Sequence, residues 1–258
     1  MQKPFRGKVL LIRRKYVVAA ALAVAVLMIF YIINHPAIVG VSGNERILPI
    51  YSVQREDRVM SLTFNVLDPA DTFTLQVMQI LNAYNVRASF FVTGEWVREN
   101  GAIAARLVGS GHELKNLSDD HSQLRKLSRD QIRDNLEACS EAIESVSGAR
   151  PGVFRAPYGE YDDNLVALAQ SLGLHTVQWS IDSGDWRGGQ ADAILRQVQT
   201  RAFAGGIVLL HSNLEQTVEA LPQIIEVLLA DDFALIPVSE LMHQTEFTVS
   251  ITGRQIPI

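Results

Sequence analysis

The sequence contains a single cysteine, Cys139, so no disulfide can form within the chain. It also contains no internal repeat and no low-complexity segment. These absences exclude a disulfide-stapled scaffold and a repeat array. Stability must then come from a packed core, and the apolar fraction of 48% is ordinary for a globular protein. The length of 258 residues allows a short anchor and one domain of about 200 residues.

Acidic residues are absent from the first 43 positions, which hold six Lys and Arg residues. Residues 16–33 form an unbroken apolar run of 18 residues, which as a helix spans roughly 27 Å and nearly crosses a ~30 Å membrane core. A cleaved signal peptide is the alternative, but its apolar region is usually about 7–15 residues long. By the positive-inside rule we expect residues 1–15 in the cytoplasm. Residues 16–33 are then a single transmembrane signal anchor in the cell membrane, and the domain is extracytoplasmic.

The charge of the remaining chain is strongly negative. The whole sequence has 23 Lys and Arg against 28 Asp and Glu, so removing the six N-terminal cations leaves a net charge of −11 beyond residue 43. Such a surface repels phosphate groups, and we expect no nucleic-acid partner. Residues 34–52 lack a helical period and are interpreted as a linker, and residues 244–258 as a C-terminal tail.

Strand and helix patterns alternate regularly over residues 53–243. Short runs rich in Val, Ile, Leu and Phe predict strands near 58–65, 87–92, 112–115, 153–155, 174–180, 206–210 and 234–237. Apolar residues at helical spacing predict helices at 72–84, 128–146, 165–172, 192–203 and 218–229. This alternation indicates an α/β fold, a parallel (β/α) barrel that is seven-stranded and irregular, preceded by the transmembrane helix.

Five polar clusters fall where predicted strands end, which is where parallel α/β folds carry their chemistry. Taken singly, each has an ordinary explanation, such as a helix cap, a turn or a core histidine. Their occurrence together in one domain is much harder to explain that way. They span residues 63–67, 111–121, 154–159, 179–186 and 207–212.

In this order the clusters resemble the polysaccharide deacetylases with a NodB-type domain, also classed as carbohydrate esterase family 4. The resemblance covers residues 53–243, and the segment 86–92 is similar to the family's second strand. The N-terminal anchor and the segments 48–53 and 158–163 are most similar to the membrane-anchored, sporulation-associated branch. The resemblance implies removal of an N-acetyl group from an amino sugar of the cell envelope, such as peptidoglycan. It also implies a divalent metal, usually zinc, held by one Asp and two His.

The residues at the matching metal and base positions depart from the family pattern. The resemblance places the general base at Asn65 and the three metal ligands at Val66, Leu117 and His121. A catalytic zinc needs three protein ligands, and only His121 can serve. An amide cannot abstract a proton at neutral pH, which alone costs about 10²–10⁴-fold in rate. We therefore expect impaired catalysis and no bound zinc.

The rest of the family's site is present in the sequence. The resemblance assigns Arg155 to orienting the base, the Tyr158 backbone N–H to the oxyanion, and His211 to the general acid. It assigns Asp182 or Asp185 to orienting that acid, and Trp186 and Leu209 to the wall that receives the acetyl methyl group. Since Arg155 has lost its carboxylate, we expect a cation free to bind a sugar oxygen or an anionic group. Trp186 and Tyr158 favour a sugar ligand, because aromatic faces cover the apolar side of a pyranose.

Three functions remain open at this point. The first is a catalytically impaired, membrane-anchored protein that binds an N-acetylated envelope glycan. The second is an active N-deacetylase with substituted ligands, in which Asp71 or Asp119 joins His121 in holding zinc or another divalent metal; Asp68 and Asp120 are also nearby. The third is a non-catalytic domain that docks another protein.

Overall fold

The computed structural model describes residue 24 and residues 46–67, 70 and 73–258. Residues 47–258 form one compact unit. No helix among the described residues is long and apolar enough to cross a membrane. The predicted anchor at 16–33 lies outside the described part of the chain apart from Val24, so it stays a prediction.

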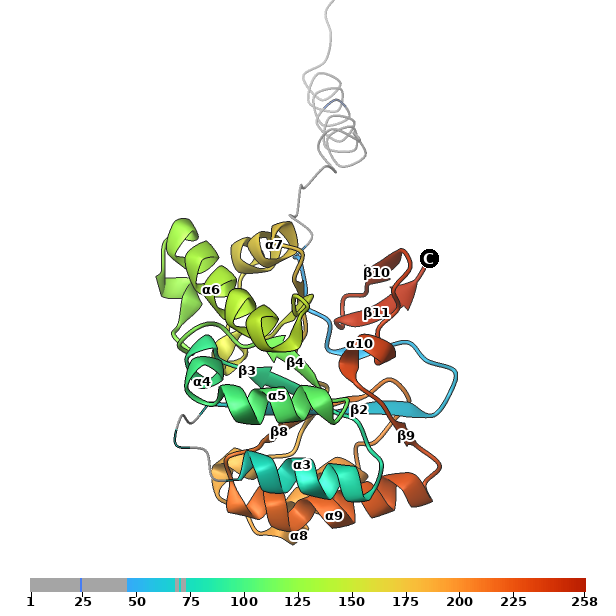
Figure 1. The fold of residues 1–258 in the computed structure, drawn as a ribbon. Helices are drawn as coiled ribbons and strands as arrows, with labels where there is room; N and C mark the ends of the chain where they lie inside the picture. Colours follow the sequence, from blue (N-terminus) through green and yellow to red (C-terminus); the bar gives the residue numbers. More distant parts are fainter. Residues whose placement is uncertain (1–23, 25–45, 68–69, 71–72) are drawn as a thin grey trace, which may run out of the picture. The chain divides into compact units, whose positions relative to one another are not determined.

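A curled parallel sheet forms the centre of this unit (Figure 1). Its strands follow the order β6-β5-β4-β3-β2-β8-β7, and β9 pairs with the beginning of β2. The sheet curls into a half-barrel, which agrees with the predicted α/β barrel class. The predicted number of seven strands is wrong, because the described residues form eight. The strands span Val59–Val66 (β2), Ser89–Val92 (β3), Glu113–Asn116 (β4), Val153–Phe154 (β5), His175–Thr176 (β6), Ile181–Asp182 (β7), Ile207–His211 (β8) and Ala234–Leu235 (β9).

The single strand predicted at 174–180 is wrong, because the chain changes partners within it. Val177 N still donates to Phe154 O at the end of β5, at 2.8 Å. Gln178 N instead donates to Ile50 O at 2.8 Å, and Ser180 N to Ile207 O on β8 at 3.1 Å. The segment around Ile50 thus lies between the two parts of the predicted strand, which become β6 and β7.

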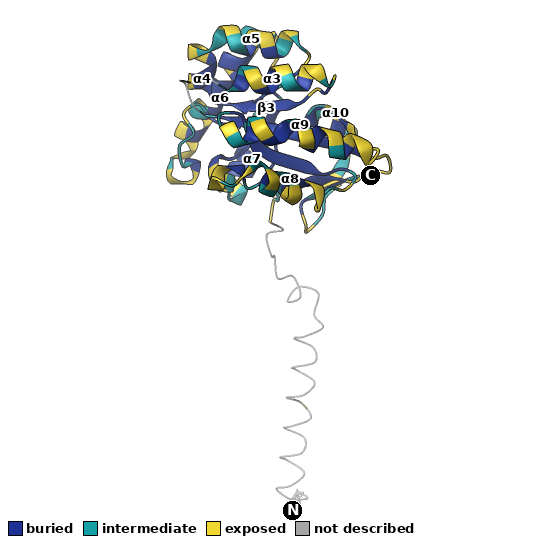
Figure 2. Cartoon of the chain, turned by 90° about the horizontal axis from the view of Figure 1, so that it is seen from below, coloured by how far each residue is buried: buried dark blue, intermediate teal, exposed yellow. Residues whose placement is uncertain are grey.

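Helices cover the outer face of the sheet, and α3, α9 and α8 lie side by side (Figure 1). Figure 2 shows their buried inner faces and exposed outer faces. The five predicted helices are present, whereas α4, α5 and α10 were not predicted. The helices span Thr74–Ala83 (α3), Gly94–Glu99 (α4), Gly101–Gly109 (α5), Arg129–Ser147 (α6), Asp163–Ser171 (α7), Ala191–Gln199 (α8), Glu215–Ala230 (α9) and Val238–Leu241 (α10).

Strand β2 is buried along its whole length and carries different residues on its two faces. Leu62, Phe64 and Val66 pack into the core beneath the outer helices. Successive strand side chains point to opposite faces, so Thr63 and Asn65 face the concave side of the sheet. This alternation places one polar row where the carboxyl ends of β2 and β8 meet.

The region predicted as a tail contains two further strands. Phe247–Val249 (β10) and Arg254–Pro257 (β11) form an antiparallel pair. β11 also pairs in parallel with Ser52–Val53 (β1), giving a three-stranded sheet in the order β1-β11-β10. This sheet could not be predicted from the sequence, because its strands lie at opposite ends of the compact unit and are very short.

Candidate functional site

A cleft of about 410 Å³ opens at the carboxyl ends of the strands. It collects residues from all five polar clusters of the sequence. Two large aromatic side chains at the cleft, Tyr158 and Trp186, are 62% and 55% exposed, so a ligand can reach them. The lining residues are Asn65, Leu67, His121, Tyr158, Trp179, Asp182, Trp186, Leu209, His211, Asn213 and Leu214.

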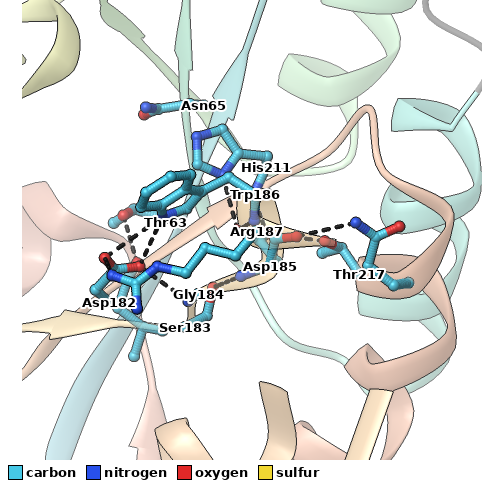
Figure 3. Close-up of polar contacts among 12 residues, drawn as sticks. Thr63, Asn65, Asp182, Ser183, Gly184, Asp185, Trp186, Arg187, His211 and Thr217 are labelled. Atoms are coloured by element: carbon cyan, nitrogen blue, oxygen red, sulfur yellow. Dashed lines mark hydrogen bonds and ion pairs between the residues drawn. The ribbon is translucent and has the colours of Figure 1, made fainter. Parts of the chain in front are cut away.

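One side of the cleft is built around the carboxylate of Asp185, which is fully buried (Figure 3). It accepts hydrogen bonds from the backbone N–H of His211 at 2.6 Å, from Thr217 Oγ1 at 2.8 Å and from the backbone N–H of Trp186 at 2.8 Å. It also lies 2.9 Å from Nδ1 of His211. Because a carboxylate only accepts, Nδ1 donates and Nε2 is left for the cleft.

Asp182 has a different role from Asp185 in this geometry. Its Oδ1 accepts from the backbone N–H of Gly184 at 2.9 Å and from Nε1 of Trp186 at 3.3 Å. Its Oδ2 lies 3.6 Å from the guanidinium of Arg187, which in turn stacks 4.7 Å from the Trp186 ring centroid (Figure 3). The two carboxylates were equal candidates for orienting His211, and only Asp185 contacts it. Asp182 instead positions the indole of Trp186.

Arg155 is completely buried, so the expectation of a free cation in the cleft is wrong. Its Nη1 donates to Oδ1 of Asn65 at 2.9 Å and its Nη2 to Oγ1 of Thr63 at 2.9 Å. The backbone oxygens of residues 177 and 178 accept further bonds. The guanidinium also stacks 3.7 Å from the ring centroid of Phe91 and 5.6 Å from that of Trp179. Arg155 therefore supports the cleft from behind and does not line it.

His121 lies across the cleft on the loop after β4, with no carboxylate bound to its ring in the described structure. Its backbone has φ of 56°, and Tyr158 beside it has φ of 60°. Both values lie in the left-handed region that non-glycine residues rarely adopt. The two ring centroids are 4.5 Å apart. Burial, and secondly the charge of His211, lower the pKa of His121 to about 4, while Asp120 raises it.

The other two metal positions have become part of the hydrophobic cores. Val66 packs into the core beneath the outer helices, and Leu117 packs with Phe91 on the concave side. Both side chains are completely buried. The residues that match the family's metal site therefore provide one ligand where a catalytic zinc needs three.

Asp119, a possible substitute ligand, is engaged elsewhere. Its two carboxylate oxygens accept from Arg98 at 2.9 and 2.8 Å. Asp68 and Asp71 lie outside the described residues. Among the residues that are described, no three His, Cys, Asp or Glu side chains are grouped closely enough to hold a metal ion. The described residues thus do not fit the zinc site that the family implies.

Three residues of the site were missed in the sequence analysis. Thr63 shares the concave face of β2 with Asn65 and could have been found from the two-residue period of strands. Thr217 lies in the first turn of α9, and Trp179 stacks on Arg155 from the segment between β6 and β7. Trp179 lies in the cluster 179–186, but its contact with Arg155 could not be read from the sequence. Thr217 lies outside all five clusters and reaches the site only through the fold.

The fold and cleft define a class, the deacetylase-type α/β half-barrel with its site at the strand ends. The family model for polysaccharide deacetylases matches residues 52–177. A chitooligosaccharide deacetylase of Bradyrhizobium sp. (strain ANU 289) is 31% identical over 216 residues, which cover 75% of this chain and 98% of that protein. The chain therefore belongs to the polysaccharide deacetylase family.

Other relatives include both enzymes and a pseudoenzyme. A peptidoglycan-N-acetylglucosamine deacetylase of Bacillus cereus is 34% identical over 170 residues, covering 64% of this chain but only 62% of that protein. The crystal structure of a CE4-family pseudoenzyme from Bacillus anthracis is 31% identical, with a TM-score of 0.72, covering 75% of this chain and 68% of that one. A mutant of that pseudoenzyme is described as having restored enzymatic activity; it is 30% identical, with a TM-score of 0.72, covering 75% and 71%.

Proposed function

We propose that this protein is a membrane-anchored, extracytoplasmic member of the family that binds an N-acetylated envelope glycan in the cleft and no longer deacetylates it. The observation that carries the proposal is the contrast within the cleft. The residues that would hold the sugar and orient the acid are present, while Asn65, Val66 and Leu117 stand at the base and metal positions.

The ligand class follows from the exposed aromatic residues. The indole of Trp186 is fixed by Asp182 on one edge and by Arg187 on one face. A side chain held in this way loses little conformational freedom on binding, which favours affinity. Tyr158 supplies a second aromatic surface that lines the same cleft. Relatives named as peptidoglycan and chitooligosaccharide deacetylases support an N-acetylated glycan as the ligand.

The cellular location is proposed from the sequence. The basic segment 1–15 and the apolar run 16–33 support a single-pass signal anchor with the domain outside the cytoplasm. In this arrangement the cleft meets the cell wall. Fractionation of cells should recover the full-length chain with membranes, and a mature N-terminus within 34–40 would contradict the anchor.

A direct test of catalysis uses the full-length chain in detergent with an N-acetylated chitooligosaccharide. We expect binding, no stoichiometric zinc, and no acetate release with or without added zinc. Asn65→Asp alone should not restore release, since two ligand positions remain apolar. Acetate release by the unaltered chain that a chelator abolishes and zinc restores would instead establish the active enzyme with substituted ligands. In that case Asp71→Ala and Asp119→Ala would identify the ligands.

Glycan binding is tested with Trp186→Ala, which should weaken affinity for the chitooligosaccharide by about tenfold, in line with the value of an aromatic contact. Phe203→Ala is a matched control, because Phe203 is also partly exposed, at 38%, but does not line the cleft. If the unaltered chain binds no glycan and is instead captured by an envelope protein, the docking function replaces this proposal.

A further inference from the structure

The guanidinium of Arg155 has no counter-anion among the residues that the structure describes. All the partners found for it among the described residues are neutral oxygens and aromatic rings. No Asp or Glu side chain of the described chain forms an ion pair with it. A buried cation without an anion is costly, and burial accordingly lowers the pKa of Arg155 to about 9. In the described part of the chain, the positive charge behind the cleft is therefore uncompensated.

Asn65 stands between this charge and the cleft. A guanidinium only donates hydrogen bonds, so the amide oxygen of Asn65 must face Arg155, as the 2.9 Å contact shows. The orientation of the amide is thereby fixed, and its Nδ2 group points away from Arg155. No oxygen among the described residues accepts from Nδ2, and Asn65 lines the cleft. The position that would carry an accepting carboxylate in an active relative thus presents two N–H donors.

The negative charges that the structure describes at the cleft, Asp182 and Asp185, do not cancel this effect. Asp182 lines the cleft, but its carboxylate is bound by Gly184, Trp186 and Arg187. Asp185 is buried behind His211 and its oxygens already accept four hydrogen bonds. Asp182 lies on β7 and Asp185 follows it, and β8 separates β7 from β2, whose penultimate residue is Asn65.

We infer that the cleft selects a sugar that carries a carboxylate group, with Nδ2 of Asn65 as its donor and the charge of Arg155 as its electrostatic partner. The ligand carboxylate supplies the counter-anion that Arg155 lacks among the described residues, while Trp186 and Tyr158 cover the sugar ring. This inference rests on the proposed glycan-binding function and specifies the class of glycan. The chemistry requires a carboxylate on the ring or on a short substituent.

The test compares two probes of the same ring, glucuronate and glucose, titrated into the full-length chain by calorimetry. We expect glucuronate to bind about tenfold more tightly than glucose, as for a hydrogen bond to a charged group. Asn65→Asp should abolish this preference, because it restores an internal counter-anion and replaces the donor by a carboxylate. Asn82→Asp adds the same charge at an exposed position on α3 and should leave the preference unchanged.

The outcomes separate this inference from the proposed function. Equal affinity for the two probes, with chitooligosaccharide binding intact, would overturn the carboxylate selectivity and leave glycan binding standing. A preference that survives Asn65→Asp would also overturn it, since the selectivity would then come from other groups. Loss of all glycan binding in the unaltered chain would instead refute the proposed function.

Discussion

The two histidines of the cleft differ in how the fold holds them. His211 ends strand β8, and its ring contacts the buried carboxylate of Asp185. His121 lies on a loop with strained backbone, and its ring contacts only another ring, that of Tyr158, among the interactions described. The His211 side is tied together by hydrogen bonds to a buried charge, which are costly to lose. The His121 side has lost its metal partners, and their places are filled by apolar residues that stabilise the cores.

The largest loss of stability is expected from removing the carboxylate of Asp185, which holds the His211 side of the cleft together. Asp185→Ala removes the acceptor of four hydrogen bonds in a fully buried position. We expect a loss of about 3–5 kcal/mol in the free energy of unfolding, measured by urea denaturation. Asp182→Ala, on the partly exposed neighbour, should cost about 1 kcal/mol. Equal losses would show that Asp185 has no special structural role.

A second prediction concerns the converted metal position Val66. Val66→Asp places a carboxylate in the core beneath the outer helices, because the side chain points away from the cleft. We expect about 3 kcal/mol of destabilisation, since a buried polar group without partners is unfavourable. Val66→Thr keeps the shape and replaces one methyl group by a hydroxyl, so it should cost about 1 kcal/mol.

An unchanged stability of Val66→Asp would mean that residue 66 can reach the cleft. The His121 side of the cleft would then gain a carboxylate that could bind a metal from the single substitution Val66→Asp. The combined variant Asn65→Asp, Val66→Asp and Leu117→His should then be assayed for zinc content and acetate release.

The third prediction uses the lowered pKa of His121. The ring titrates at about 4 in the folded chain against 6.5 in the unfolded chain. Between these values the unfolded chain binds a proton that the folded chain does not, so stability falls as the pH drops from 6.5 towards 4. His121→Asn, which tolerates the left-handed backbone, should flatten this dependence in denaturation measured across the window.

The His121→Asn variant should still lose some stability as the pH drops from 6.5 towards 4. Burial lowers the pKa of His112 to about 4 as well, with a smaller effect from Arg87, and His112 lies at the other end of β4. If the free energy of unfolding of His121→Asn depended on pH as steeply as that of the unaltered chain, the His121 ring would have to be solvated. The two histidines of the cleft would then be less different than their contacts indicate.

The smallest expected effect is a gain in stability. Asn65→Asp gives Arg155 a charged partner in place of a neutral amide, and charge-assisted hydrogen bonds are about twice as strong as neutral ones. We expect the free energy of unfolding to rise by about 1 kcal/mol in urea denaturation. Asn82→Asp should leave it nearly unchanged. A loss of stability in Asn65→Asp would show that the positive charge of Arg155 is already compensated.

The fold and the site could be predicted from the sequence only where residues close together in the chain form a recognisable pattern. The helix at α6 followed from the apolar residues at helical spacing over 128–146, and the structure shows Ser128 and Gln131 in a capping box with Gly148 left-handed at the end. The strand at β2 followed from its apolar run. The burial of Arg155 could not be predicted, because its acceptors come from strands and loops far apart in the chain. The choice between Asp182 and Asp185 also depended on how β7 and the three-residue turn that follows it place these two carboxylates.

The sequence by itself determined the α/β class, the family resemblance and the absence of two metal ligands and the base, since each depends on which residue stands at which position. Only the tertiary structure decided what those substitutions mean. Val66 became a core residue because strand alternation turns its side chain away from the cleft. Leu117, just after β4, became one by packing with Phe91 on the concave side. Asn65 became a donor to the cleft because the buried Arg155, which can only donate, occupies its oxygen.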